Sequence, residues 1–312
     1  MTAIEPIDPI IAGHNSFFGV DHLSQTRGAE KAEKFANVEN IVGVLRLCDD
    51  IGVSAVMMST HPRAAEVSRV LAAQSELVSR IRIYPLVPYI QKYVRGSNEK
   101  GLANLIFDTL GQAPLGQRLA LMLKGGKGVM HNDLEQMLRL LLDVELLPFK
   151  NLKLGAVFLH DALTDLALGL GLEHILTIYR RHVEETYGVQ AGLTTKNLPL
   201  LRDRLEAMGW TNPLVMASLN AAGFYVNPSL EQCAETVRRP GLDFVAMSTL
   251  ASGHLHPDEA YRYLGQFPEI RSVVVGMSRR EHLEETVQTL RQHLPWLDNR
   301  GREEPCPSEI RE

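Results

Sequence analysis

The sequence predicts a closed barrel of eight parallel strands, the (β/α)8 or TIM barrel. Eight short apolar runs alternate with stretches of helical periodicity along the 312 residues. The strand runs are apolar at successive positions, as in 53–59 (VSAVMMS), which is typical of parallel strands buried on both faces. An open doubly wound sheet is the main alternative, but the Gly-x-Gly-x-x-Gly loop of that fold does not follow the first strand.

The individual elements follow from periodicity and from helix-start signals. Strands are predicted at 7–13, 53–59, 81–88, 153–160, 189–194, 213–220, 243–249 and 271–276. Helices are predicted at 37–52, 62–74, 173–187, 197–208, 229–239, 257–264 and 279–294, with a long turn before 173. Asn37 is a candidate N-cap, and Pro62 suits a first helical turn because its missing N–H costs no hydrogen bond there.

A helical insertion, about 90–151, interrupts the alternation between the third and fourth strands. Three apolar-faced helices are predicted in it, from GLANLIFDTL, PLGQRLALML and LEQMLRLLLDVELL. They could cover an apolar substrate or form a homo-oligomer interface, and a membrane-surface role around Lys124 and Lys127 is a further alternative. Residues 1–297 are predicted to form a single domain, and 298–312 a flexible tail.

Composition excludes several classes of function. The net charge is −5, from 32 Lys and Arg against 37 Asp and Glu, so the broad basic field of a nucleic-acid-binding protein is missing. No run of 18 apolar residues predicts a membrane span, and the first residues lack the basic region of a secretory signal. The three cysteines have no metal-binding spacing and fit a reducing compartment. We therefore expect a cytoplasmic protein that acts on a small molecule.

Polar residues at the C-terminal ends of the strands are the candidates for catalysis, because chemistry in such barrels sits at that end. His14, His61 and His160 follow the first, second and fourth strands, and Tyr89 follows the third. Imidazole titrates near neutrality and suits proton transfer. The alternative is that these side chains only satisfy loop backbone groups. Since neighbouring strand residues face opposite ways, His160 is favoured for catalysis and Asp161 for a structural or capping role.

Metal binding and Schiff-base chemistry are weaker hypotheses. The three strand-end histidines lack any short His-x-His or His-x-x-x-His anchor, and His254 with His256 lies in a loop that leads into a helix. Lys196 is a candidate amine nucleophile. Its segment opens a helix that Thr195 or Asn197 can cap, so Lys196 is expected to be a solvated first-turn residue. We expect no metal.

The segments after the last two strands predict an anion site. Gly276 lets backbone approach a ligand, and Ser278 supplies a hydroxyl at a helix start whose N–H groups favour an anion. Arg279 or Arg280 would pair with that anion. Loops seven and eight of such barrels frequently hold a phosphate. The alternative is an ordinary capping box between Ser278 and Glu281, and both can hold together.

Four segments in the second half of the chain resemble the aldo-keto reductases, over residues 153–290. LKLGAVFLHDAL resembles the family's fourth strand, VQAGLTTKN its fifth, DFVAMSTLASGHL its seventh, and SVVVGMSRREHLEET its cofactor segment. The resemblance implies NADP or NAD as cofactor, a carbonyl or alcohol substrate, and His160 as the active-site histidine. The cofactor contacts it implies are Ser248, Leu250, Gly276, Ser278, Arg279, His282 and Glu285, to which we add Thr194 and Asn220.

The chain departs from that family where the proton donor should be. The catalytic Tyr and the Lys that activates it have no counterpart in MMSTHPRAAEV and IRIYPLVPYI. The strand-five Ser-Asn pair is Thr194-Thr195, and the strand-six Gln is Met216 or Ala217. The residues that could take over proton transfer are His160, His61, His14, Tyr84 and Tyr89.

Two other functions stay open at this point. The first is a non-redox acid/base enzyme, metal-assisted or not, that acts on a phosphorylated or sugar-like substrate. The second is an inactive barrel that serves as a binding protein. The gathered histidines argue against the second, because an inactive site has no need of titratable groups. We favour the oxidoreductase, since the segments after the last two strands match a cofactor site in kind and position.

Overall fold

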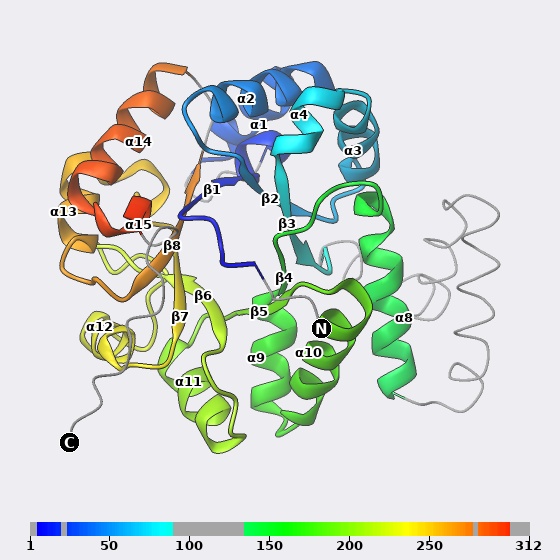
Figure 1. The fold of residues 1–312 in the computed structure, drawn as a ribbon. Helices are drawn as coiled ribbons and strands as arrows, with labels where there is room; N and C mark the ends of the chain where they lie inside the picture. The colour runs from blue at the N-terminus through cyan, green and yellow to red at the C-terminus, as the bar shows by residue number, and fades with distance from the viewer. Residues whose placement is uncertain (1–4, 20–23, 90–133, 277–279, 300–312) are drawn as a thin grey trace, which may run out of the picture.

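The structure is a computed structural model that describes residues 5–19, 24–89, 134–276 and 280–299. Its eight parallel strands form a closed barrel in chain order, with β8 returning to pair with β1 (Figure 1). This confirms the predicted fold class. The strands are β1 (Ile10–Gly13), β2 (Ala55–Ser59), β3 (Arg82–Val87), β4 (Ala156–Leu159), β5 (Gln190–Thr194), β6 (Leu214–Ser218), β7 (Asp243–Met247) and β8 (Ile270–Gly276).

Helices surround the barrel on all sides (Figure 1). The α-helices are α1 (Gln25–Lys34), α2 (Val38–Asp50), α3 (Ala64–Ala72), α4 (Ser75–Arg80), α8 (Leu134–Leu146), α9 (Asp161–Gly169), α10 (His174–Tyr187), α11 (Leu198–Ala207), α12 (Leu230–Arg238), α13 (Pro257–Leu264), α14 (Arg280–His293) and α15 (Trp296–Asn299). Three short 3-10 helices are η1 (Asn15–Phe18), η2 (Leu147–Phe149) and η3 (Ala251–Gly253). The side chains of Asn37 and Asn197 cap α2 and α11, as the sequence predicts.

Four helices differ from the prediction. The long turn expected before residue 173 is wrong, because α9 begins directly after β4 and fills that stretch. Helices α1 and α4 were not predicted, since α1 is almost wholly polar and α4 has only six residues, too short to show a helical period. Helix α15 occupies the start of the expected tail. No helix in the described ranges is long and apolar enough to cross a membrane.

The described part of the insertion contains α8 and the short η2. Helix α8 coincides with the third helix predicted there and packs on α10 and β3. The two other helices predicted in the insertion, at 101–110 and 114–123, lie outside the described residues, as does most of the tail. The division into one domain and a tail stays a prediction.

A core cluster fills the inside of the barrel and identifies which strand residues point inward. Its fully buried members are Ile11, Ala55, Met57, Tyr84, Ala156, Phe158, Leu214, Met216 and Val245. Gly192 makes room for the Phe158 ring, because a Cβ at 192 would lie 2.6 Å from that ring. Alternation along the strands then carries the inward face to the next layer at the C-terminal end. That layer, which we call the mouth, consists of Gly13, Ser59, His160, Thr194, Ser218, Met247 and Gly276.

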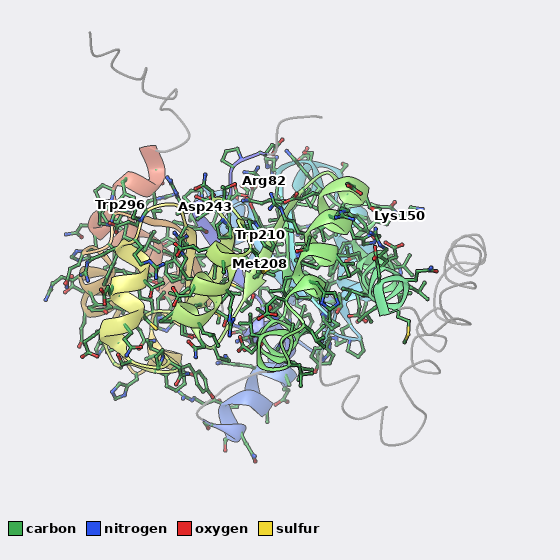
Figure 2. The ribbon with its side chains drawn as sticks, turned by 90° about the horizontal axis from the view of Figure 1, so that it is seen from below. Arg82, Lys150, Met208, Trp210, Asp243 and Trp296 are labelled. Carbon is green, nitrogen blue, oxygen red and sulfur yellow. The ribbon has the colours of Figure 1, made fainter. Side chains whose placement is uncertain are left out.

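The opposite, N-terminal end of the barrel is closed by a polar cluster. The Tyr84 hydroxyl donates to Asp8 Oδ2 at 2.6 Å, and Arg82 pairs with the same carboxylate. Arg82 and Asp243, which open β3 and β7, lie on the upper side of Figure 2, whereas α1 projects from the lower side. Burial, reinforced by Asp8, raises the pKa of Tyr84 well above its ordinary value. Tyr84 is therefore wrong as a candidate for proton transfer at the mouth.

Candidate active site

The three histidines predicted at the strand ends gather at one rim of the barrel. His14 is 9 % exposed, and the charges of His61 and His160 both act on it. Burial, followed by those two neighbours, lowers the pKa of His14 to about 4. Burial also lowers the pKa of His61, with Arg63 adding to the effect. At neutral pH the β1–β2 side of the rim therefore carries uncharged imidazoles.

Aromatic rings pack against these imidazoles. Phe18 stacks on His61 with ring centroids 4.4 Å apart and an interplanar angle of 13°. Tyr89 meets the other side of His61 edge-on at 5.0 Å, and His14 lies 5.8 Å from Phe18. The four rings form a continuous wall from η1 to the end of β3. Such a wall presents a planar, largely apolar surface to anything held at the mouth.

A carboxylate that the sequence analysis missed fixes this wall from behind. Glu145 on α8 is 2 % exposed, and its Oε2 accepts hydrogen bonds from the Thr60 hydroxyl and, at 3.1 Å, from the Tyr89 N–H. The Tyr89 N–H also reaches Thr60 Oγ1 at 3.0 Å. Helix α8 thus ties the ends of β2 and β3 together and sets the position of the Tyr89 ring. No local motif signals this, because Glu145 and Thr60 lie 85 residues apart.

His160 lies between the mouth and the start of α9. It is the N-cap residue of that helix, and its Nδ1 lies 2.6 Å from Asp161 Oδ1. The Ala162 N–H donates to Asp161 Oδ1 at 3.0 Å and to His160 Nδ1 at 3.2 Å, and the second of these contacts requires Nδ1 without a proton. With a proton on Nδ1, both the ring and this N–H donate to Asp161, and Nε2 remains for the mouth. Asp161 is thus the first residue of α9 rather than its N-cap, and its Oδ1 contacts both the Ala162 N–H and His160 Nδ1.

Lys196 is exposed, as expected, and it also has two defined partners. Its Nζ lies 3.1 Å from Asp161 Oδ2 and 4.9 Å from the centre of the Tyr225 ring, and its side chain is 45 % exposed. Burial alone would raise the pKa of Asp161, but His160 and Lys196 outweigh burial and hold it well below its usual range. Asp161 is therefore ionised throughout the physiological pH range, with one cationic partner fixed beside it.

Thr194, the predicted cofactor contact at the end of β5, is an unsatisfied polar group. Its side chain is 3 % exposed, and its Oγ1 has no hydrogen-bond partner among the described residues. It lies two residues beyond Gly192, which faces the barrel interior, so it faces the mouth. The pairing of Leu159 with Leu193 makes it the neighbour of His160 in register. A buried hydroxyl without a partner costs free energy unless a ligand satisfies it.

The loop after β7 has an unusual backbone. Ser248, Ala251 and Ser252 all have positive φ, at 56°, 47° and 60°, a region that non-glycine residues rarely adopt. Buried Asn220 holds this loop, since its Nδ2 donates to the Ser248 carbonyl at 3.1 Å and to the Phe224 carbonyl at 2.9 Å. Backbone strain of this kind costs on the order of 1–3 kcal/mol per residue and clusters at functional sites.

The remaining predicted cofactor residues are distributed around β7 and β8. Gly276 is exposed and borders open space, since a Cβ there would meet no atom within 4 Å. Leu250 packs with Leu255 and their neighbours under the loop after β7, whereas His282 and Glu285 are exposed on α14. Ser278 and Arg279 lie outside the described residues.

The described residues contain no group of three or more His, Cys, Asp or Glu side chains that could hold a metal ion. The three rim histidines therefore influence one another electrostatically without forming a ligand set. Among the described residues, the site offers imidazoles, the ionised Asp161 carboxylate and the Lys196 ammonium group. These groups are suited to moving protons.

Similarity to known proteins is found in the fold. No family model matches the sequence, and no curated protein matches it. Two solved structures described as "putative aldo-keto reductase", both from Pseudomonas aeruginosa, resemble it throughout. The first has 15 % identity and a TM-score of 0.57 over 92 % of this chain and 90 % of that one. The second has 13 % identity and a TM-score of 0.58 over 92 % and 91 %. The chain thus shares its (β/α)8 barrel fold with these two structures.

Proposed function

We propose that this protein is a cytoplasmic oxidoreductase that uses NADP or NAD to interconvert a small carbonyl compound and its alcohol, with His160 as the proton carrier. The observation that carries the proposal is the placement of His160. Its ring is fixed through Nδ1 by an ionised carboxylate, and it stands at the end of β4 in a barrel of the aldo-keto-reductase type. Chemistry in such barrels occurs at this end.

One residue of the mouth supports the proposal of a nicotinamide cofactor. Thr194 Oγ1 is buried and unsatisfied beside His160 in register, and the carboxamide of a nicotinamide carries the donors and acceptors that such a hydroxyl needs. The exposed Gly276 leaves open space at the end of β8, on the side where the resemblance expects the phosphates. Thr194 would hold the nicotinamide end, and the strained loop at Ser248 with Gly276 would border the remainder.

When bound, the cofactor supplies or accepts a hydride at the substrate carbon. His160 handles the accompanying proton at Nε2. In reduction the imidazolium donates this proton to the developing alkoxide, and in oxidation the neutral ring accepts one from the alcohol. Asp161 keeps the charge of the imidazolium compensated through Nδ1, and it holds the ring in one orientation.

The opposite side of the rim excludes water and orients the substrate. His14 and His61 are uncharged at neutral pH and lie against Phe18 and Tyr89, so this wall favours an apolar or planar substituent next to the carbonyl. The half-buried Leu86, Met247 and Val274 pack on the core inside the barrel and add apolar surface. The proposed substrates are therefore small aldehydes and ketones with an aromatic or bulky apolar group.

Nucleotide binding provides the first test. Titration with NADPH and NADH, followed by thermal shift and cofactor fluorescence, should give saturable binding of one of them. Thr194→Val removes the hydroxyl at nearly constant volume and should weaken binding by about 1 kcal/mol, which corresponds to about five-fold. Thr236→Val is the matched control, because Thr236 is equally buried but donates to the carbonyl of Gln232 on α12, far from the mouth.

Turnover provides the second test. Purified protein with either nicotinamide should reduce members of a panel of aromatic and aliphatic aldehydes and ketones, and His160→Gln should abolish this reduction while leaving nucleotide binding unchanged. Absence of binding by both nucleotides at millimolar concentration would contradict the proposal. Binding without turnover on any substrate would contradict the assignment of His160 as a proton carrier.

A further inference from the structure

The Asp161 carboxylate bridges two groups that come from different strand ends. One oxygen lies 2.6 Å from His160 Nδ1, and the other lies 3.1 Å from Lys196 Nζ. The Asp161 side chain is only 12 % exposed, whereas the side chains of His160 and Lys196 are 29 % and 45 % exposed. A partly buried carboxylate with a cation on one side and an imidazole on the other is held in both position and charge.

Lys196 is itself held in place. Its backbone N–H donates to Asp165 Oδ2 at 2.9 Å, and the Thr195 hydroxyl donates to the other oxygen of Asp165 at 2.5 Å. Its ammonium group lies over the Tyr225 ring at 4.9 Å, a cation–π distance. Helix α9 therefore contacts the segment after β5 twice, through Asp161 and through Asp165. These contacts hold Lys196 so that its ammonium group lies beside Asp161.

We propose that Asp161 and Lys196 are positioning residues for His160. Asp161 accepts the Nδ1–H of His160, which fixes the ring tautomer and presents Nε2 to the mouth, and Lys196 keeps Asp161 ionised and in contact. This assignment rests on the proposed function in one respect, that His160 is the proton carrier. Lys196, which follows β5, thus helps to position His160, which follows β4.

A second histidine–carboxylate pair provides an internal reference. His182 Nε2 lies 2.7 Å from Asp143 Oδ1, and their side chains are 7 % and 10 % exposed. This pair lies between α10 and α8, and the Tyr187 hydroxyl donates to the same Asp143 oxygen at 2.7 Å. Asp143→Asn therefore removes a carboxylate from a histidine away from the mouth. It reports what loss of such a pair does when only the fold is affected.

The first experiment observes the tautomer directly in the full chain. In protein labelled with 15N-histidine, long-range 1H–15N spectra should show His160 with a proton fixed on Nδ1, its signals assigned by their loss in His160→Gln. Asp161→Asn should remove this preference, and Lys196→Met should weaken it. Asp143→Asn should change only the signals of His182. An unchanged His160 ring in Asp161→Asn would overturn the proposal.

The second experiment separates kcat from KM, using a carbonyl substrate that the panel identifies. Asp161→Asn should lower kcat by about 10- to 100-fold, the range typical of carboxylates that orient metal-bound histidines, with KM changed less than about two-fold. Lys196→Met should lower kcat by up to about five-fold, and Lys196→Arg should restore most of the loss. Lys196 is half-exposed at the surface, so its variants test the proposal even if Asp161→Asn folds poorly.

The outcomes distinguish this proposal from the proposed function. Loss of the Nδ1–H tautomer in Asp161→Asn, in a protein that reduces no carbonyl, would retain the positioning pair and reject the oxidoreductase. Turnover that depends on His160 but not on Asp161 or Lys196 would do the reverse. Equal loss of kcat in Asp161→Asn and Asp143→Asn would show that both carboxylates act only through the fold, and would also overturn the proposal.

Discussion

Two histidine–aspartate pairs in this molecule have nearly the same contact distance, one through Nδ1 and one through Nε2, and different surroundings. The His160–Asp161 contact is 2.6 Å and the His182–Asp143 contact is 2.7 Å. His160 is about four times as exposed as His182, with 29 % against 7 % of its side chain accessible. The first pair stands at the rim of the barrel, whereas the second is enclosed between α8 and α10.

The two aspartates also differ in the group that each contacts besides its histidine. Asp161 receives the ammonium group of Lys196, whereas Asp143 receives the neutral hydroxyl of Tyr187. Burial, with Asp143 beside it, raises the pKa of Tyr187 far above its ordinary value, so Tyr187 remains a hydrogen-bond donor at any physiological pH. The pair at the mouth is partly open to solvent, and the enclosed pair connects two helices. Access, rather than the pair itself, distinguishes a catalytic group from a structural one.

The largest expected difference between the two pairs is in turnover. His160→Gln should lower kcat by about 10²- to 10⁴-fold, because a positioned general acid contributes about that much. His182→Gln should leave kcat within about two-fold at temperatures where the variant is folded, since its ring does not reach the mouth. Steady-state kinetics with the nicotinamide and a reducible carbonyl would measure both. Comparable losses in the two variants would remove the functional distinction drawn between the pairs.

The second prediction reverses the ranking and concerns stability. Asp143→Ala leaves the His182 ring and the Tyr187 hydroxyl buried without their common acceptor, and should lower the free energy of unfolding by about 2–4 kcal/mol. Urea denaturation would measure this loss.

Asp161→Ala is the matched control for that measurement. Its histidine and lysine partners are both partly exposed and can turn to water, so the loss should stay below about 1 kcal/mol. A larger loss for Asp161→Ala than for Asp143→Ala would contradict the assignment of Asp143 to the fold and Asp161 to the site.

The parts of the fold that could be predicted from the sequence are those with local signals. Strands that are apolar on both faces and helix starts such as Asn37 and Asn197 are local signals, and the predicted barrel is confirmed. Helix α1, whose residues are nearly all polar, carries no apolar period and was missed. Helix α9 was taken for a turn, since its nine residues contain too few helical turns to establish a period beside the adjacent glycines.

Titration of His14 gives the third prediction. Its pKa is about 4 in the folded protein against about 6.5 in an unfolded chain, so the unfolded state binds the extra proton first as the pH falls. The stability that His14 contributes is complete above pH 6.5 and is lost as the pH falls toward 4, by roughly 2–3 kcal/mol. Urea denaturation at pH 7.5, 5.5 and 4.5 should show this loss.

His14→Gln serves as the reference for the pH series, because it cannot take up the proton. Its stability should fall less than that of the wild-type protein over the same interval. Parallel curves for the two proteins would show that His14 does not titrate as its burial requires. Since His14 lies at the rim beside His61 and His160, the result also reports how dry that side of the mouth is.

The candidate site could be predicted only where single residues mark strand ends. His14, His61, His160 and Tyr89 were found because the C-terminal ends of strands face one mouth. The contact between Asp161 and Lys196 could not be predicted, because it depends on the register that places β4 beside β5. Glu145 was likewise hidden, because its partner Thr60 is distant in sequence and its own helix shows only an apolar pattern.

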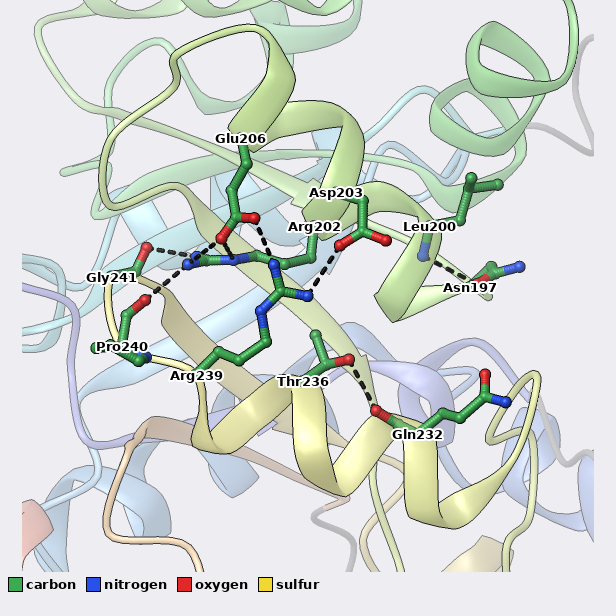
Figure 3. Close-up of polar contacts among 10 residues, drawn as sticks. All are labelled: Asn197, Leu200, Arg202, Asp203, Glu206, Gln232, Thr236, Arg239, Pro240 and Gly241. Carbon is green, nitrogen blue, oxygen red and sulfur yellow. Dashed lines mark hydrogen bonds and ion pairs between the residues drawn. The ribbon is translucent and has the colours of Figure 1, made fainter.

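The smallest predicted effects concern two arginines, Arg202 and Arg239, at the N-terminal end of the barrel. They test whether burial also determines how much a charged contact stabilises the fold. Arg202 is 4 % exposed, and it donates to the carbonyls of Gly241 and Pro240 at 2.5 and 2.6 Å and to Glu206 at 2.8 Å (Figure 3). Arg239 pairs with Glu206 and with Asp203 from the solvent side. Arg202→Met keeps the buried stem but removes three hydrogen bonds donated by a buried guanidinium, so it should cost about 2 kcal/mol of unfolding free energy.

Arg239→Ala should cost less than about 1 kcal/mol, because its ion pairs are screened by water, and the loss should shrink further in high salt. Urea denaturation at low and high ionic strength measures both variants in the same series. Neither variant should change kcat, since both residues lie away from the mouth. A salt-sensitive Arg202 or a costly Arg239 would mean that burial does not set the value of a charged contact in this barrel. The same reasoning for the two histidine–aspartate pairs would then lose its basis.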